Sequence, residues 1–522
     1  MLRFEGILTP IRAMGRLLVL VLATLLPAAA HAGEVFGPAF SQFSLTLESG
    51  QRTEAVGPLY YRQTTEWGNT LALPPLFSKF EAPDLSRTEI DFAYPLLTYD
   101  RDGTEWRWQL FQLLSFDGSA DQSAHKNRQF TLFPFYFQQL SDDPKQTYHA
   151  LFPIYGHLQR RLFRSEIDFV LWPLYVKTTR YATINTNGEA SPPLGIASSW
   201  FTPRSGEVTT YNYVYPFFHL RYGDGLRGWQ FWPVTGHELK VVTTKTNSWG
   251  DAETIPGHEK RFVLWPFYFD ETRGIGSTNI EKQWTLLPLY SQMRSPRRDS
   301  TSYGWPFGVI ITDDREKKYH EVDALWPLVV FAHGEGKTAR RIWPLFSQAH
   351  NDTVESDFYL WPLYKYNRLH SGALDRDRTR ILLFLYSHVN EKNTETGKAK
   401  HRSDFWPLYT HQTDFNGNSR LQILAPLEPI LPASKSIARD YSPIWSLWRS
   451  EHNPTTHAAS QSLLWNLYRH ERAGVDKKCS LLFGLFQYQS GATGGNVKLF
   501  YLPLGATKTK PQPPADADKT AR

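Results

Sequence analysis

The chain has a single cysteine, Cys479, among its 522 residues. A disulfide needs two cysteines, so an internal disulfide framework of the kind found in many small secreted domains is excluded. No cysteine lies near the N-terminus, so we expect no lipid attachment there. For an exported chain of this length, the lack of disulfides favours a Gram-negative envelope protein over a eukaryotic secreted one.

Long apolar runs are also missing, except for one near the N-terminus. Arg12 and Arg16 precede the run "LLVLVLATLL" at residues 17–26, and small residues follow up to Ala32. This order is typical of a secretory signal peptide, so we predict one over residues 1–32, with cleavage before Gly33. Beyond it, no run reaches the eighteen or so apolar residues that a transmembrane helix needs. Any insertion into a membrane would therefore be made by strands.

The chain has little excess of either charge. Its formal net charge is +6, and the signal segment carries three arginines and one glutamate, which leaves about +4. This balance gives no argument for nucleic acid, which we do not expect as a partner.

Signatures of catalysis are missing as well. The "GEGKT" stretch at residues 334–338 has Phe331 where a phosphate-binding loop needs its first glycine. The sequence contains neither a His-Glu-x-x-His zinc motif nor a Gly-x-Ser-x-Gly elbow. We therefore predict a protein that is not an enzyme and that has no catalytic residues, no metal and no cofactor.

The chain is rich in aromatic residues, which make up 15% of it, and they recur in a repeated motif. Segments such as "VLWPLYV", "VLWPFYF", "IWPLFS" and "FWPLYT" return along the chain, most of them 17 to 23 residues after the last. With the motif proline as position zero, we count about twenty such repeats. Charged and glycine-rich turn signals lie between them.

We interpret each repeat as one strand of about twelve residues, with the proline at its centre, followed by one turn. This predicts an all-β fold, a large antiparallel repeat assembly of about 20 strands that is closed or nearly closed, because closure removes exposed strand edges. The assembly would form one domain over residues 50–505. Residues 33–49 would lead into it, and the Pro-, Ala- and Lys-rich residues 506–522 would form a disordered tail.

In that interpretation the motif residues form a structural belt at one height around the sheet. Alternation along a strand would place Trp at −1 and Leu or Phe at +1 on one face, and the proline and an aromatic residue at +2 on the other. If both faces are buried, Trp361→Ala should cost about 3 to 5 kcal/mol of stability. The residues that we expect to define the belt are Trp172, Pro173, Tyr175, Trp265, Pro266, Tyr268, Trp343, Pro344, Trp361, Pro362, Tyr364, Trp406, Pro407 and Tyr409.

Histidines recur at position +4 of five repeats, where other repeats have Gln, Asp or Lys. If the strands are in register, these residues form a polar ring one step beyond the belt tyrosines. We expect them to bond across strands and to mark where the apolar belt meets water, with a proton-sensing, metal or ligand role as the alternative. They are His157, His237, His388, His411 and His470.

Two architectures fit the belt. One is an outer-membrane β-barrel with a structural or transport role, whose apolar band faces lipid. The other is a shallow, bent ring, periplasmic or membrane-peripheral, that binds lipid or a protein partner through its aromatic belt. In both, the protein is exported and the outer membrane or its lipids are the expected partner. The first requires an open polar lumen, which the second apolar face does not provide.

The repeat resembles bacterial exported proteins of unknown activity that are rich in WPL[YF] segments, and by fold it resembles the shallow-barrel arrangement called a β-flower. The resemblance covers nearly all of residues 33–522. It implies an all-β exported protein and implies no particular reaction.

Overall fold

The protein is seen in a computed structural model, which describes residues 35–504 apart from 120–126, 143–145, 162–163, 181–207, 247–251 and 492–493. The expected signal peptide at 1–32 and the expected tail at 506–522 lie outside the described residues. So does the start of the lead-in expected at 33–49.

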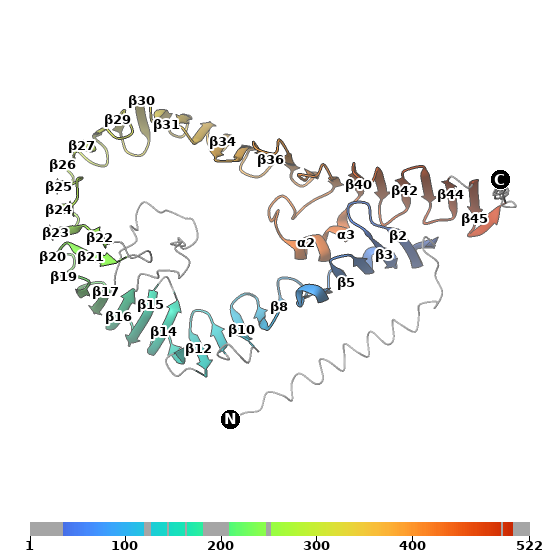
Figure 1. Ribbon diagram of the computed structural model, residues 1–522, viewed down its shortest axis with the longest axis horizontal. Helices are drawn as coiled ribbons and strands as arrows, with labels where there is room; N and C mark the ends of the chain where they lie inside the picture. Colours follow the sequence, from blue (N-terminus) through green and yellow to red (C-terminus); the bar gives the residue numbers. More distant parts are fainter. Residues whose placement is uncertain are drawn as a thin grey trace, which may run out of the picture.

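The described residues form one antiparallel sheet of 44 strands, in which each strand pairs with the strand before it in the sequence. The sheet is narrow and long, and it bends into the pear-shaped loop of Figure 1. A separate hairpin, β21 (Thr243–Thr246) and β22 (Ala252–Ile255), projects from it between β20 and β23.

The first ten strands form an N-terminal limb, with short 3-10 turns η1 (Gly37–Ala39), η2 (Gly57–Leu59) and η3 (Pro83–Leu85). The strands are β1 (Val35–Phe36), β2 (Phe40–Ser44), β3 (Gly50–Ala55), β4 (Tyr60–Thr65), β5 (Gly68–Leu73), β6 (Phe77–Ala82), β7 (Arg87–Phe92), β8 (Leu97–Asp102), β9 (Glu105–Leu110) and β10 (Leu114–Ser119).

The next strands of the sheet make the wide bend of the loop. They are β11 (Asn127–Leu132), β12 (Tyr136–Ser141), β13 (Tyr148–Leu151), β14 (Tyr155–Arg161), β15 (Arg164–Val170), β16 (Tyr175–Arg180), β17 (Val208–Tyr213), β18 (Phe218–Gly223), β19 (Leu226–Phe231), β20 (Thr235–Lys240), β23 (Gly257–Val263), β24 (Tyr268–Ile275), β25 (Glu281–Leu286), β26 (Tyr290–Arg294), β27 (Arg298–Tyr303), β28 (Val309–Asp314), β29 (Tyr319–Ala324) and β30 (Val329–Gly334).

The last strands form a C-terminal limb, with helices α2 (Lys435–Asp440) and α3 (Ser442–Trp445) inserted between β39 and β40. The strands are β31 (Thr338–Ile342), β32 (Phe346–His350), β33 (Val354–Tyr359), β34 (Tyr364–Ser371), β35 (Leu374–Ile381), β36 (Tyr386–Asn393), β37 (Ala399–Phe405), β38 (Tyr409–Thr413), β39 (Ser419–Ile423), β40 (Trp448–Asn453), β41 (Ala458–Leu463), β42 (Tyr468–Ala473), β43 (Asp476–Leu481), β44 (Phe486–Gly491), β45 (Gly494–Leu499) and β46 (Leu502–Leu504).

The structure confirms an all-β antiparallel repeat assembly, but the predicted strand count of about 20 was wrong. Each repeat holds two short strands, as in β15 and β16, and Pro173 lies in the turn between them. Proline has no N–H and interrupts a strand ladder, so it is accommodated in a tight turn and not at a strand centre. The belt residues Trp172 and Pro173 are therefore turn residues, and Tyr175 begins the next strand.

Of the predicted closed or nearly closed sheet, full closure was wrong, because no strand pairing among the described residues joins the two ends of the sheet. The ends instead lie face to face, as the labels β2 and β3 beside β40 and β42 show in Figure 1. Thr46 Oγ1 donates to Ser460 Oγ at 2.6 Å, and the Arg469 guanidinium lies 3.4 Å from the centre of the Phe43 ring. We call the face that the two limbs turn toward each other the inner face, and the opposite one the outer face.

Helix α2 lies between the two limbs and adds to this contact. Arg439 donates to Ser78 at 2.8 Å and to Glu89 at 3.0 Å, and it also pairs with Asp91 at 2.5 Å. Its backbone oxygen accepts a hydrogen bond of 2.9 Å from the Tyr61 hydroxyl. One residue of the helical insert thus contacts three strands of the N-terminal limb.

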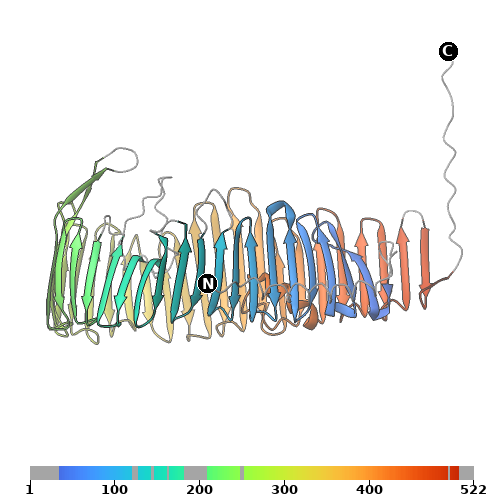
Figure 2. The same cartoon turned by 90° about the horizontal axis from the view of Figure 1, so that it is seen from below.

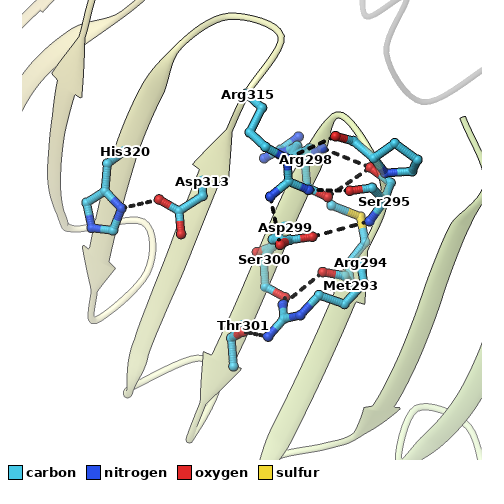
Figure 3. A network of polar contacts seen from close by, with 11 residues as sticks. Met293, Arg294, Ser295, Arg298, Asp299, Ser300, Thr301, Asp313, Arg315 and His320 are labelled. Atoms are coloured by element: carbon cyan, nitrogen blue, oxygen red, sulfur yellow. Dashed lines mark hydrogen bonds and ion pairs between the residues drawn. The ribbon is translucent and has the colours of Figure 1, made fainter.

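The strand ends form two different edges, which Figure 2 shows along the bottom and the top of the sheet. One carries the motif turns, and we call it the apolar edge. The other, the loop edge, carries more polar connections, of which Figure 3 shows one. There Arg315 donates to the backbone oxygen of Pro296 at 2.9 Å and to Asp299 at 3.0 Å, and Arg294 donates to Thr301 at 2.8 Å.

Candidate functional site: the apolar edge

The motif turns share one backbone geometry. In the turn at residues 171–174, the Leu174 N–H donates to the Leu171 oxygen at 2.8 Å, and the peptide bond between Trp172 and Pro173 is cis. Fourteen motif prolines among the described residues follow a cis peptide bond. The turns thus reverse the chain within three to five residues and present their side chains at the end of each hairpin.

Neighbouring turns are hydrogen-bonded to one another. The Trp172 N–H donates to the Pro153 oxygen at 2.7 Å, and the Trp361 N–H donates to the Pro344 oxygen at 2.8 Å. Because the sheet ladder continues through the turns, adjacent turns are held at one level. The apolar edge is therefore continuous from turn to turn, except where residues 424–447 replace one turn, and it forms the lower edge of the sheet in Figure 2.

Large apolar side chains along this edge are exposed. At position +1 of the turns, the exposed fraction lies between 45 and 79% for eleven side chains: Leu76, Phe135, Ile154, Leu174, Phe217, Phe267, Leu289, Phe307, Leu345, Leu363 and Leu408. Position −2 adds exposed residues such as Leu171, Leu264 and Leu360. Contiguous exposed apolar surface on this scale is uncommon in soluble proteins and marks an interaction surface.

Indole rings line the same edge at position −1. Trp172, Trp265, Trp343 and Trp361 are 42 to 49% exposed, so the case in which both faces of the belt are buried does not hold for them. Trp343 and Trp361 have ring centres 6.1 Å apart, so these residues pack against each other while keeping one side free. The prediction of two alternating apolar faces was wrong, because positions −1 to +1 lie in a turn, where strand alternation does not apply.

Polar side chains replace apolar ones within two residues of the turns. On the outer face, Tyr175 begins β16 beside Tyr213, with ring centres 5.6 Å apart, and Lys177 follows two residues later. Tyr268, Tyr364 and Tyr409 begin strands in the same way. The apolar edge is thus a thin layer, and an aromatic row separates it from charged residues.

The five position +4 histidines lie in this polar row on the outer face, each as the third residue of a strand. His157 Nδ1 bonds to Asp168 on the next strand, and His237 Nε2 bonds to Glu259 at 3.1 Å. His388 and His411 both pair in register with Ser403, one from each side. His470 pairs with Gln461 and Cys479. The five histidines are dispersed around the loop and do not converge on one site.

The inner face is lined with charged residues, a feature that the sequence interpretation missed. Arg420 and Arg449 each lie 2.9 Å from Glu451. Burial alone would raise the pKa of Glu451, but the two guanidinium groups outweigh it and hold this pKa at about 2. Alternation counted outward from each turn, with the proline excluded from the strand, would have revealed this face.

One sector of the inner face is apolar. Phe137, Leu158, Ile167, Phe169 and Val176 from β12 to β16 form a buried cluster there. A groove of about 680 Å³ runs over this cluster from the turn residues toward β18 and β19. It is the place where the inner face packs most like an ordinary hydrophobic core.

Within the described ranges, no helix is long and apolar enough to cross a membrane, and no three His, Cys, Asp or Glu side chains gather as metal ligands would. Comparison of the chain with protein-family models, curated proteins and solved structures finds no match. The apolar edge, with its exposed apolar side chains, is therefore the candidate functional site.

Proposed function

We propose that the protein is a non-enzymatic, membrane-peripheral β-ring that docks its apolar edge onto a lipid surface of the cell envelope. The observation that supports this proposal is the row of exposed Leu, Phe and Trp side chains at one edge of the sheet. Each such side chain gains about 1.5 to 3 kcal/mol when it is fully transferred from water to an apolar environment. A few adjacent turns would therefore suffice for stable association.

The thickness of the apolar layer also favours peripheral docking. Charged side chains return two residues beyond the turns, so the apolar layer is about 7 Å deep at roughly 3.4 Å per residue. This depth is close to the ~5 to 10 Å by which interfacial elements enter a leaflet. Tryptophan and tyrosine rings are enriched at that level of membranes, where this edge carries them.

Strand length argues in the same direction. Most strands have six residues, as β17 and β18 do, whereas a membrane-spanning strand needs about 9 to 11 residues. This favours the membrane-peripheral alternative over an outer-membrane barrel with a structural or transport role, which remains the competing hypothesis.

Vesicle flotation tests the proposal. The chain without residues 1–32 is mixed with phosphatidylcholine vesicles, and its F267D/L289D/F307D variant removes apolar groups from three consecutive turns that are 54 to 79% exposed. We expect at least a tenfold loss of the vesicle-bound fraction, because three charges would enter the interface. Alkaline carbonate should release the bound wild-type protein.

A matched variant, W67D/F415D/V475D, makes the same chemical change at exposed positions of the loop edge, between β4 and β5, β38 and β39, and β42 and β43. The vesicle-bound fraction of this variant should be within twofold of the wild-type fraction. Equal flotation of both variants, or no flotation of the wild type, would contradict the proposal. Carbonate-resistant binding would favour the barrel. A wild-type dimer that F267D/L289D/F307D dissociates, without vesicle binding, would show that a second copy covers the edge.

A further inference from the structure

Charged groups on the inner face are generally paired, either along one strand or between neighbouring strands. In the C-terminal limb, Arg402 lies 2.8 Å from Asp404, and Arg376 lies 3.3 Å from Glu391. Lys400 lies 3.7 Å from the same Glu391. Buried or half-buried charges are normally matched in this way, because an unpaired charge away from water is costly.

Three inner-face cations of the same limb form no ion pair with any described residue: Lys365 on β34, and Arg378 and Arg380 on β35. Lys365 lies directly opposite Arg380 in the strand register, and Arg378 is two residues along the same face. Like charges directly opposite each other destabilise a sheet. The sequence thus places three positive groups together at an energetic cost.

The surrounding side chains do not offset this charge. Asp404, an inner-face acid two strands away from Arg380, already accepts from Arg402 and, at 2.6 Å, from Thr410. The Nε atoms of Arg378 and Arg380 are buried and have no hydrogen-bond partner among the described residues. Burial, together with the neighbouring Arg380 and Arg376, lowers the pKa of Arg378.

The height of the cluster above the apolar edge is defined by the strands. Lys365 is the second residue of β34 after the turn at 360–363, and Arg380 is the last but one residue of β35 before the turn at 382–385. At about 3.4 Å per residue, these two side chains begin roughly 3 to 7 Å above the turns, and Arg378, two residues farther along β35, begins roughly 10 to 14 Å above them. With the edge in the acyl region, that is the level of the lipid headgroups.

We propose that Lys365, Arg378 and Arg380 form a binding site for the phosphate of an anionic lipid headgroup on the inner side of the ring. The guanidinium groups would donate paired hydrogen bonds to phosphate oxygens, for which their planar geometry is suited, and the ammonium group would add a point charge. This proposal rests on the proposed docking of the apolar edge, and it specifies that the lipid surface contains anionic lipids.

The test compares vesicles of phosphatidylcholine alone with vesicles that contain about one third phosphatidylglycerol. The K365Q/R378Q/R380Q variant removes the three charges and leaves a shorter, neutral polar side chain at each position. A matched control, R297Q/K317Q/K318Q, removes three cations from the loop edge. Since a cation near an anionic surface contributes strongly to binding, we expect the first variant to lose roughly tenfold or more of the affinity for anionic vesicles. Binding to neutral vesicles should stay within twofold.

The control variant should keep the preference for anionic vesicles. The inference is overturned if both variants lose the preference for anionic vesicles equally, because the net charge of the protein would then explain that preference. It is also overturned if wild type binds neutral and anionic vesicles equally well, which leaves the docking proposal intact.

If wild type binds no vesicle, docking itself has failed. The site is then titrated with dihexanoyl-phosphatidylglycerol below its micelle concentration and with inorganic phosphate. Absence of lipid binding, or equal affinity for phosphate alone, would overturn the assignment to a lipid. Binding of the short-chain lipid that only K365Q/R378Q/R380Q abolishes would support it. A thermal midpoint of this variant that is at or above that of wild type excludes misfolding as the cause.

Discussion

At the scale of single residues, the motif proline determines where the chain reverses. Trp172 and Pro173 lie between two strands of the sheet, and the ladder passes from turn to turn beside them. The sequence predicts which residues share one height, because the motif recurs with each hairpin. The motif was wrongly assigned to the centre of a strand. A proline interrupts a strand ladder, so its recurrence from repeat to repeat was a signal against that assignment.

The position of Trp361 changes the expected effect of its removal. The side chain is 45% exposed and contacts Trp343 on one side. Trp361→Ala should therefore lower the free energy of unfolding by only about 1 to 2 kcal/mol, from a partial loss of burial and one aromatic contact. Chemical unfolding of the variant measures this loss of stability, which should be smaller than the 3 to 5 kcal/mol expected for a buried ring.

Leu226→Ala serves as the comparison, because Leu226 is 2% exposed. That substitution should cost about 2 to 5 kcal/mol. A loss for Trp361→Ala as large as the loss for Leu226→Ala would mean that the apolar edge is covered in solution, for example by a second copy.

At the scale of elements, the helical insert departs from the repeat. Residues 424–447 occupy the place of one turn between β39 and β40, and they fold into α2 and α3 on the inner side of the sheet. The sequence offered one signal for this insert, since "APLEPILPASKSIARDYSPIW" lacks the alternating strand pattern. Its contact with β6 and β7 could not be predicted, because Arg439 and its partners are about 350 residues apart.

The insert also makes stability depend on pH. Asp440 is 1% exposed, and burial raises its pKa to about 7, with Asp91 adding to this effect and Arg439 opposing it. An acid whose pKa is raised in the folded state binds its proton there and not in the unfolded chain, so stability falls as pH rises from about 4 to about 7. The loss between pH 5 and 7 should be roughly 2 to 3 kcal/mol.

Thermal midpoints of wild type and Asp440→Asn between pH 5 and pH 8 measure this effect. The asparagine cannot ionise, so its midpoint should fall less than that of wild type as pH rises to 7, and the two curves should run parallel above it. Parallel curves from pH 5 upward would contradict the prediction. Glu89 does not alter the window, because its pKa is lowered: burial opposes the shift, but Arg439 and Arg87 outweigh it.

At the scale of the whole molecule, the sequence predicted the all-β class and the single repeat assembly. The number of strands and the open sheet were missed because a period of about twenty residues fits one long strand with one turn as well as two short strands with two turns. Closure was expected in order to remove strand edges. The protein instead packs the inner faces of its two limbs together, through contacts such as Asn466 with Glu54 at 2.6 Å.

Arg439 is expected to hold the loop in its bent shape. Arg439→Gln would leave Asp91 buried without a cation and Glu89 with Arg87 alone, and the loss of one partner of a buried ion pair typically costs about 3 to 5 kcal/mol. The limbs should then separate while each keeps its hairpins. Small-angle scattering should give a larger radius of gyration with an unchanged far-ultraviolet spectrum.

Arg87→Gln is the matched control, since Arg87 pairs with the same Glu89 at 2.7 Å from within β7 and does not bridge the limbs. Its radius of gyration should equal that of wild type. An Arg439→Gln variant with the wild-type radius would mean that the contacts of Thr46 and Asn466 alone keep the limbs together.

The strict neighbour-to-neighbour strand order makes the perimeter of the molecule a direct count of its hairpins. Each hairpin adds about 9 to 10 Å of contour, at 4.7 to 4.9 Å per strand. Gain or loss of one hairpin would leave every other strand pair intact, as in other architectures whose units contact only their neighbours. The area enclosed grows roughly with the square of that count, so duplication of a twenty-residue unit is a simple genetic route to a wider ring.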